Sequence, residues 1–312
     1  MSKAQLAIAL ITLSVATVVW AVPEKGTAHQ RVQRWEQQST AYVAPIRLHD
    51  EPEHGLVATA WLNGAGPFRF AVDTGAGVSL ITRNVVQKAH LQVSKSRRTL
   101  VGGLSTAPIA SNQQATLGGL ALGTPSNRIT TKAVAAVVTT LPGSIDGVLD
   151  PTDTFSPLGY SVDLPQRQLR VFDANSEGLR LTQAPRDGAV VPWVRLAGNG
   201  RPFVRLSDGR LALIDTGSGF GLALTDGRVA GGRRRSGEGG SRNDLGGGRV
   251  QAHEIAPQRV SIGALVLNGV PSDVLSGVAP NTPNILGRRA LFPFKITFDP
   301  IARLISFEPS ER

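Results

Sequence analysis

The chain has 312 residues, which is enough for one large domain or two modest ones. With 41% hydrophobic and 18% charged residues, it can bury a core. The absence of cysteine excludes disulfides, thiolate metal sites, iron–sulfur clusters and a cysteine nucleophile. The 35 glycines and 20 prolines favour turns and short strands, and the net charge of +10 bears on solubility more than on fold.

The N-terminus carries a targeting segment. Residues 1–22 contain Lys3 and then an apolar run that ends in small residues, as in a secretory signal peptide. The run is almost long enough to span a bilayer, so an uncleaved anchor over residues 4–22 is the alternative. Either way we expect a periplasmic or extracellular protein, which an uncleaved anchor would tether to the inner membrane. The glutamine-rich residues 23–45 are interpreted as a linker or arm.

The chain contains an internal repeat. Residues 70–77 (FAVDTGAG) match residues 212–219 (ALIDTGSG), and each copy follows an alternating, strand-like stretch and a glycine-containing turn. A glycine cluster lies about thirty residues after each aspartate. Farther on, residues 145–149 correspond to residues 284–287, and two strand-like segments follow each. Landmarks that recur in the same order indicate a duplicated unit.

The duplicated unit predicts an all-β fold of two lobes with an active-site cleft between them. Hydrophobic residues alternate with a period of two, and Val, Ile, Thr and Phe are frequent in short runs between turns. We expect an N-terminal lobe over residues 46–175 and a C-terminal lobe over residues 189–309. Only residues 83–92 and 288–292 have the pattern of short helices.

Each copy places an aspartate at a tight turn after an apolar strand, in Asp73-Thr74-Gly75-Ala76 and Asp215-Thr216-Gly217-Ser218. Two carboxyls brought together cannot both ionise easily, so the pair shares a proton. A water between them can lose a proton to the charged member and attack a carbonyl that the protonated member polarises. This chemistry requires no metal and no cofactor.

These residues resemble the aspartic proteases, and residues 284–292 (NILGRRALF) are similar to the matching segment of the retropepsin-like branch. The resemblance spans residues 55–308 and implies an aspartic endopeptidase that cuts extended polypeptides. It implies that Asp73 and Asp215 are catalytic, that Thr74 and Thr216 form a grip between the lobes, and that Gly102 and Gly103 lie on a flap. The remaining turn residues would support the active site: Gly75, Ala76, Gly217 and Ser218.

Two departures from the family pattern bear on the site. Asp150 stands where a hydrophobic–hydrophobic–glycine element should end, which could weaken support for the dyad. Ser218 has Ala76 as its counterpart, and we expect its hydroxyl to donate to Asp215 and to favour that aspartate as the ionised partner. A non-catalytic, peptide-binding relic of the same fold is the alternative that Asp150 motivates.

The remaining sequence features do not indicate a second function. The glycine- and arginine-rich residues 226–249 have no aromatic side chain for base stacking, so we predict a disordered insertion and no nucleic-acid partner. The five histidines lack metal-ligand spacing and are interpreted as surface or linker residues. A glycosidase would also use two acids, but scarce aromatic residues argue against it. We expect a monomer whose partner is its polypeptide substrate.

Overall fold

The structure is a computed structural model that describes residues 43–311 except 102, 106–108, 197–198, 226–239, 244–248 and 280. The predicted signal peptide or anchor and most of the predicted arm lie outside the described residues, as does most of the arginine-rich segment. Strands dominate the described part of the chain, in agreement with the predicted all-β class. Among these residues, no helix has the length and apolar character needed to cross a membrane.

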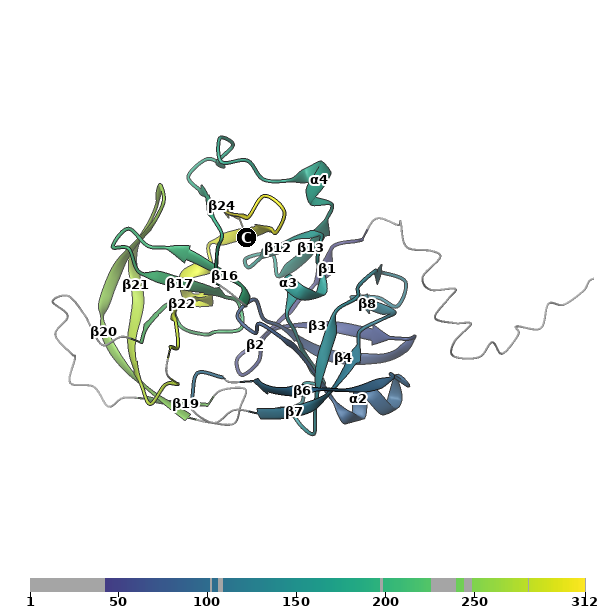
Figure 1. The fold of residues 1–312 in the computed structure, drawn as a ribbon. Coiled ribbons are helices and arrows are strands. Elements are labelled where there is room, and N and C mark those ends of the chain that lie inside the picture. Colours follow the sequence, from purple (N-terminus) through teal and green to yellow (C-terminus); the bar gives the residue numbers. More distant parts are fainter. Residues whose placement is uncertain are drawn as a thin grey trace, which may run out of the picture.

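The first lobe is built on one large sheet, drawn in blue and teal in Figure 1. Its path runs β6-β7-β10-β5-β11-β4-β3-β8-β9, and β2 pairs with β3 off this path. The strands of this sheet are β2 (His49–Glu51), β3 (Gly55–Leu62), β4 (Ala65–Val72), β5 (Ser79–Thr82), β6 (Val93–Val101), β7 (Ile109–Thr116), β8 (Leu120–Leu122), β9 (Arg128–Ile129), β10 (Val134–Val138) and β11 (Gly147–Leu149).

The second lobe has its own sheet, drawn mainly in green. The order of its strands is β15-β16-β17-β22-β18-β21-β20-β19. These strands are β15 (Val194–Leu196), β16 (Asn199–Arg205), β17 (Leu211–Asp215), β18 (Leu222–Leu224), β19 (Gly240–Asn243), β20 (Arg249–Ile262), β21 (Leu265–Ser276) and β22 (Asn284–Gly287).

The two sheets repeat one topology. In the first lobe β4 pairs in parallel with β11, β11 antiparallel with β5, and β5 in parallel with β10. In the second lobe β17, β22, β18 and β21 pair in the same order and with the same directions. The equivalence continues outward, so β3 corresponds to β16, β2 to β15 and the β6–β7 hairpin to β19–β20. The sequence duplication is therefore a structural duplication.

A third sheet joins the lobes. Its order is β1-β13-β12-β23-β24-β14, and the lobes meet where β12 pairs antiparallel with β23. Tyr160 of β12 stacks on Phe298 of β23 with ring centroids 4.6 Å apart, and both side chains are fully buried. The strands are β1 (Ile46–Arg47), β12 (Gly159–Asp163), β13 (Gln168–Phe172), β14 (Ala189–Pro192), β23 (Phe294–Asp299) and β24 (Leu304–Pro309).

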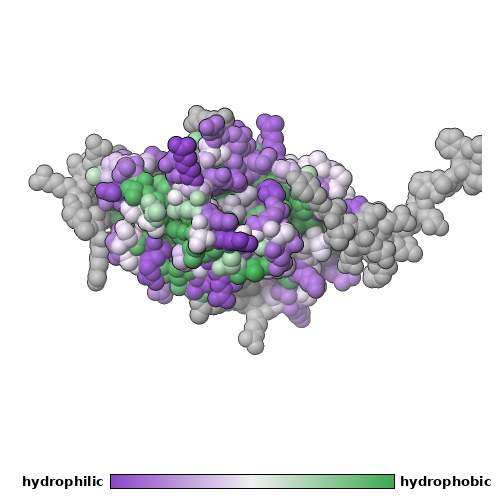
Figure 2. Space-filling view, turned by 90° about the horizontal axis from the view of Figure 1, so that it is seen from above, coloured by the Kyte–Doolittle hydropathy of each residue, from purple (hydrophilic) through white to green (hydrophobic). Residues whose placement is uncertain are grey.

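The helices are short. The two predicted from the sequence are present as α2 (Arg83–Lys88) and α5 (Arg288–Leu291). Two single-turn helices were not predicted, α3 (Pro151–Thr154) and α4 (Ala174–Glu177), and each begins after an aspartate that caps its N-terminus. Figure 2 shows a face on which hydrophilic side chains surround small hydrophobic areas. Apolar side chains are otherwise concentrated in a core shared by the lobes.

Candidate active site

Two aspartates from opposite lobes meet where the Asp-Thr-Gly turns of the lobes contact each other. Asp215 is the last residue of β17, and Asp73 follows the last residue of β4. The two residues are only 9% and 8% exposed. Each carboxyl accepts a backbone hydrogen bond from its own turn: the Gly75 N–H donates to Asp73 Oδ1 at 2.8 Å, and the Ser218 N–H donates to Asp215 Oδ1 at 2.8 Å. The turns therefore fix both carboxyl groups.

The threonines that follow the aspartates cross between the lobes. The Thr74 hydroxyl donates to the Ile214 carbonyl at 2.7 Å and accepts from the Thr216 N–H at 3.0 Å. In the reverse direction, the Thr216 hydroxyl donates to the Val72 carbonyl at 3.2 Å and accepts from the Thr74 N–H at 3.2 Å. Both threonines are fully buried. The four bonds place the two turns in register, as the predicted threonine grip requires.

The glycines that follow the threonines allow the turns to approach. A Cβ on Gly75 would lie 2.6 Å from Cγ of Asp215, and a Cβ on Gly217 would lie 2.4 Å from Cγ of Asp73. Each glycine backbone therefore packs directly on the carboxyl of the opposite lobe, where any side chain would collide. Glycine is required here by close approach, since neither residue has a positive φ.

Burial and proximity perturb the ionisation of the pair. Burial raises the pKa of Asp73, while hydrogen bonds from the Gly75 N–H and from Asp215 and the charge of Arg201 oppose that rise. Burial also raises the pKa of Asp215 well above its ordinary value, and the negative charge of Asp73 raises it further. Burial thus raises the pKa of both carboxyls, and they titrate as one coupled pair.

The hydrogen bonds of Ser218 differ from the expected ones. The bond from Ser218 to Asp215 comes from its backbone N–H, whereas its hydroxyl accepts from the Phe220 N–H at 3.3 Å. Ala76, the counterpart in the first lobe, packs against a small cluster of buried apolar residues. The predicted donor to Asp215, the Ser218 hydroxyl, is wrong, because the backbone N–H of Ser218 supplies that hydrogen bond.

Asp150 lies beside the pair and has a structural role of its own. It is 2% exposed, its carboxyl caps α3 by accepting from the Thr152 N–H at 3.0 Å, and its own N–H donates to the Ser79 hydroxyl at 3.0 Å. Burial raises the pKa of Asp150 to about 7, and the charges of Asp153 and Asp73 also raise it. The aspartate thus takes the place of the expected glycine without leaving a buried backbone donor unpaired.

The predicted flap is only partly described. Gly102 lies outside the described residues, and Gly103 precedes Leu104 near the end of the β6–β7 hairpin. The Leu104 carbonyl accepts from the Ala279 N–H of the second lobe at 3.0 Å, and Ser105 forms an antiparallel bridge with Val278. Leu104 also packs on a cluster that includes Phe220. This end of the hairpin therefore contacts the opposite lobe.

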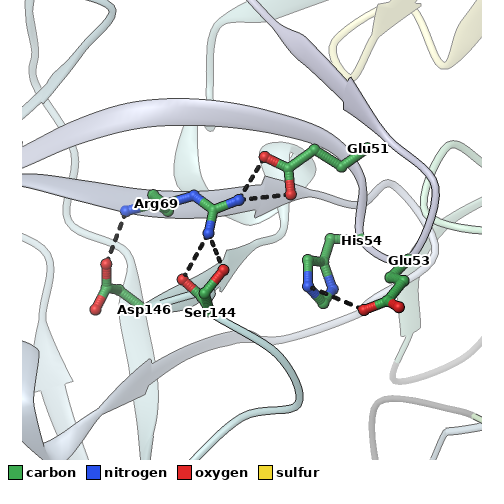
Figure 3. Close-up of polar contacts among 6 residues, drawn as sticks. All are labelled: Glu51, Glu53, His54, Arg69, Ser144 and Asp146. Atoms are coloured by element: carbon green, nitrogen blue, oxygen red, sulfur yellow. Dashed lines mark hydrogen bonds and ion pairs between the residues drawn. The ribbon is translucent and has the colours of Figure 1, made fainter.

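A polar cluster stabilises the turn between β2 and β3 (Figure 3). The Arg69 guanidinium binds both oxygens of Glu51 and also contacts Ser144, while the Arg69 N–H donates to Asp146 at 2.9 Å. His54 packs on Gly143, and its side chain is only 9% exposed. The interpretation of every histidine as a surface or linker residue is thus wrong for His54.

The comparisons with known proteins agree with this geometry. Residues 58–150, most of the first lobe, match a protein family described as "Aspartyl protease". The structure is similar to the crystal structure of an aspartic proteinase from Irpex lacteus, with a TM-score of 0.53 and 11% identity over 86% of this chain and 97% of that chain. The first lobe is thus similar in sequence to aspartyl proteases, and the described chain has the fold of an aspartic proteinase. At this identity the structural likeness shows the fold, and no curated protein sequence matches the chain.

Two arginines that the sequence did not indicate lie beside the Asp-Thr-Gly turns. Arg288 of α5 binds Asp50 of β2 at 2.7 Å, an ion pair between the lobes. Arg201 of β16 packs on Gly77, four residues after Asp73. The retropepsin-like segment contains Arg288, but its partner is 238 residues away in the sequence. Nothing in the local sequence around Arg201 indicates that it lies close to the first lobe.

Proposed function

We propose that this chain is an aspartic protease that hydrolyses peptide bonds in extended polypeptides, with Asp73 and Asp215 as the catalytic pair. The observation that carries the proposal is the crosswise packing of the two Asp-Thr-Gly turns, in which each glycine touches the opposite carboxyl. That contact brings the carboxyls closer than the separation that an inverting glycosidase leaves for its water. A carboxyl pair that shares one proton supplies a base and an acid at the same place.

We assign the negative charge of the pair to Asp73, which would take a proton from a bound water, whose oxygen then attacks the carbonyl carbon of the peptide bond. The protonated Asp215 would donate its proton to the carbonyl oxygen, which gives a tetrahedral intermediate. Transfer of a proton to the peptide nitrogen and cleavage of the C–N bond then release a carboxylic acid and an amine. The hydrogen bonds from Gly75 and Ser218 keep both carboxyls oriented throughout.

The polypeptide would lie extended between the two lobes and beneath the β6–β7 hairpin, whose main chain offers hydrogen bonds to an added strand. The contact of Leu104 with the second lobe supports this position, because it places the end of the hairpin across the junction of the lobes. We further propose that the enzyme is a monomer of the retropepsin-like branch and that it is exported by its N-terminal segment.

The test is cleavage of an unfolded protein from pH 3 to pH 8 by the wild type and by Asp73→Asn and Asp215→Asn. We expect the wild type to cut in acid and each variant to lose at least about 1,000-fold in rate. Asp187→Asn is the matched control, since Asp187 is exposed and its positive φ of 56° suits asparagine. A variant of either dyad residue with wild-type rate would disprove the assignment.

The peptide-binding alternative predicts a different result in the same assay. A wild-type chain that binds unfolded polypeptide but leaves it intact at every pH would favour a relic of the fold. Asp150 was the reason to consider that alternative, and its role as the cap of α3 weakens that reason. Binding of the substrate by the inert Asp73→Asn variant would separate recognition from cleavage.

A further inference from the structure

Arg201 reaches from the second lobe to the turn that carries Asp73. A Cβ on Gly77 would lie 3.1 Å from Cδ of Arg201 and 3.5 Å from its Nε, so the arginine stem lies directly on the Gly77 backbone. Its guanidinium carbon is 5.7 Å from the centre of the Phe203 ring, and its carbonyl accepts from the Trp193 indole N–H at 3.1 Å. The contacts with Gly77 and Phe203 hold the side chain, and the indole hydrogen bond holds its backbone.

The duplication shows that this arrangement has a counterpart. Val57 of β3 and Phe203 of β16 pair with residues two positions before Asp73 and Asp215, so Gly55 is the first-lobe equivalent of Arg201. Gly55 also crosses to the other lobe, where a Cβ on it would lie 3.2 Å from Nη1 of Arg288. Each of the two equivalent positions therefore holds one arginine: Arg288 of α5 lies beside Gly55, and Arg201 of β16 lies beside Gly77.

The surroundings of the two arginines differ in charge. Arg288 binds Asp50 of β2, which balances its charge. In the second lobe β15 is the equivalent of β2. Val194 pairs with Phe203 as His49 pairs with Val57, so Arg195 takes the place of Asp50. The charge of Arg201 instead acts on Asp215, Asp73 and Asp150. Asp153 of α3 is a further charged group that acts on Asp150.

A buried carboxyl pair needs such a charge. The Asp-Thr-Gly turns place both carboxyls out of water, where the ionised form is unfavourable, and the backbone donors of Gly75 and Ser218 offset only part of that cost. Asp150 adds a third buried carboxyl next to the pair. We propose that Arg201 is a positioning residue that stabilises the single negative charge of the Asp73–Asp215 pair. This inference rests on the proposed function.

The experiment compares pH–rate profiles from pH 2 to pH 9 for the wild type and for Arg201→Gln, Arg201→Lys and Arg205→Gln. We expect Arg201→Gln to move the acid limb up by roughly one pH unit, with about a tenfold loss of rate below that limb. Arg201→Lys should stay closer to the wild type because it keeps the charge. Arg205 is the control, since it is exposed on the same strand.

A second readout does not depend on activity. NMR titration of ¹³C-carboxyl-labelled aspartates reports the ionisation of the pair, and Arg201→Met serves as a neutral variant that keeps the stem on Gly77. If the wild type cuts nothing but Arg201→Met still shifts the titration of the carboxyl pair, the role of Arg201 is supported and the proposed function is contradicted. An active enzyme whose acid limb and titration are unmoved in Arg201→Gln and Arg201→Met would overturn the role of Arg201.

Discussion

In each lobe the strand that leads to the aspartate pairs in parallel with a second strand, β4 with β11 and β17 with β22. The residue opposite the aspartate in this pairing differs between the lobes. In the second lobe, Gly287 lies in register with Asp215, and its N–H donates to the Gly221 carbonyl at 2.9 Å. In the first lobe, Asp150 follows Leu149 in the same pairing, and its N–H donates to the Ser79 hydroxyl at 3.0 Å. A serine side chain therefore replaces a backbone carbonyl as the acceptor.

This replacement explains which residue each turn tolerates. A Cβ on Gly287 would lie 2.6 Å from the Phe220 carbonyl and 2.9 Å from the Ser218 carbonyl, so only glycine fits there. In the first lobe, the Asp150 side chain has room to cap α3. A duplicated fold can thus keep its geometry while one copy exchanges a glycine for a third buried carboxyl.

The largest expected effect concerns Asp150 and pH. Its pKa is raised from 3.8 to about 7 on folding, so the protonated form stabilises the native state. This contribution is complete below about pH 4 and is lost as the pH rises to about 7, on the order of 4 kcal/mol. Asp150→Asn, which keeps a capping side chain, should be more stable than the wild type at pH 8. Urea unfolding at pH 4, 6 and 8 measures this difference.

Asp208→Asn is the control for that series, because Asp208 lies in an exposed turn where its pKa is lowered by the hydrogen bond from Arg210. Its stability should not gain at alkaline pH. Free energies of unfolding that run parallel with pH for the wild type and Asp150→Asn would show that the first lobe has no acid-favoured carboxyl at this position.

The glycine substitutions come next. Gly217→Ala and Gly75→Ala should each lower kcat/KM by about 100-fold, because the added Cβ displaces the carboxyl of the opposite lobe. Gly118→Ala is the matched control, since a Cβ there meets no atom within 4 Å. Peptide cleavage kinetics measure kcat/KM for the three variants. Full activity in Gly217→Ala would mean that the turns do not approach as closely as described.

The threonine grip gives the smallest of the three effects and sharpens the comparison between the lobes. The hydroxyl bonds of Thr74 are 2.7 and 3.0 Å long, whereas both bonds of Thr216 are 3.2 Å. Thr74→Ala should cost about 2 kcal/mol of unfolding free energy, and Thr216→Ala somewhat less. Denaturant unfolding measures both, with Thr→Ser at each position as the variant that keeps the hydroxyl. Equal or reversed costs would remove the asymmetry.

The sequence predicted the features that follow from local patterns and from the repeat. The alternating strands, the two Asp-Thr-Gly turns and the helices at Arg83 and Arg288 were visible because each depends on neighbouring residues. The role of Asp150 was not predictable, because its acceptor, Ser79, is 71 residues away. The contact of Arg201 with Gly77 was also hidden, since it depends on how two lobes pack.

The claim that the two aspartates act as one unit can be tested by comparing kcat/KM for Asp73→Asn, Asp215→Asn and the double variant on one peptide substrate. If the carboxyls share a proton and activate one water, removing the second after the first should cost almost nothing further. We predict that the double variant is as slow as either single variant. Losses that multiply, or a single variant with substantial activity, would contradict a shared catalytic pair.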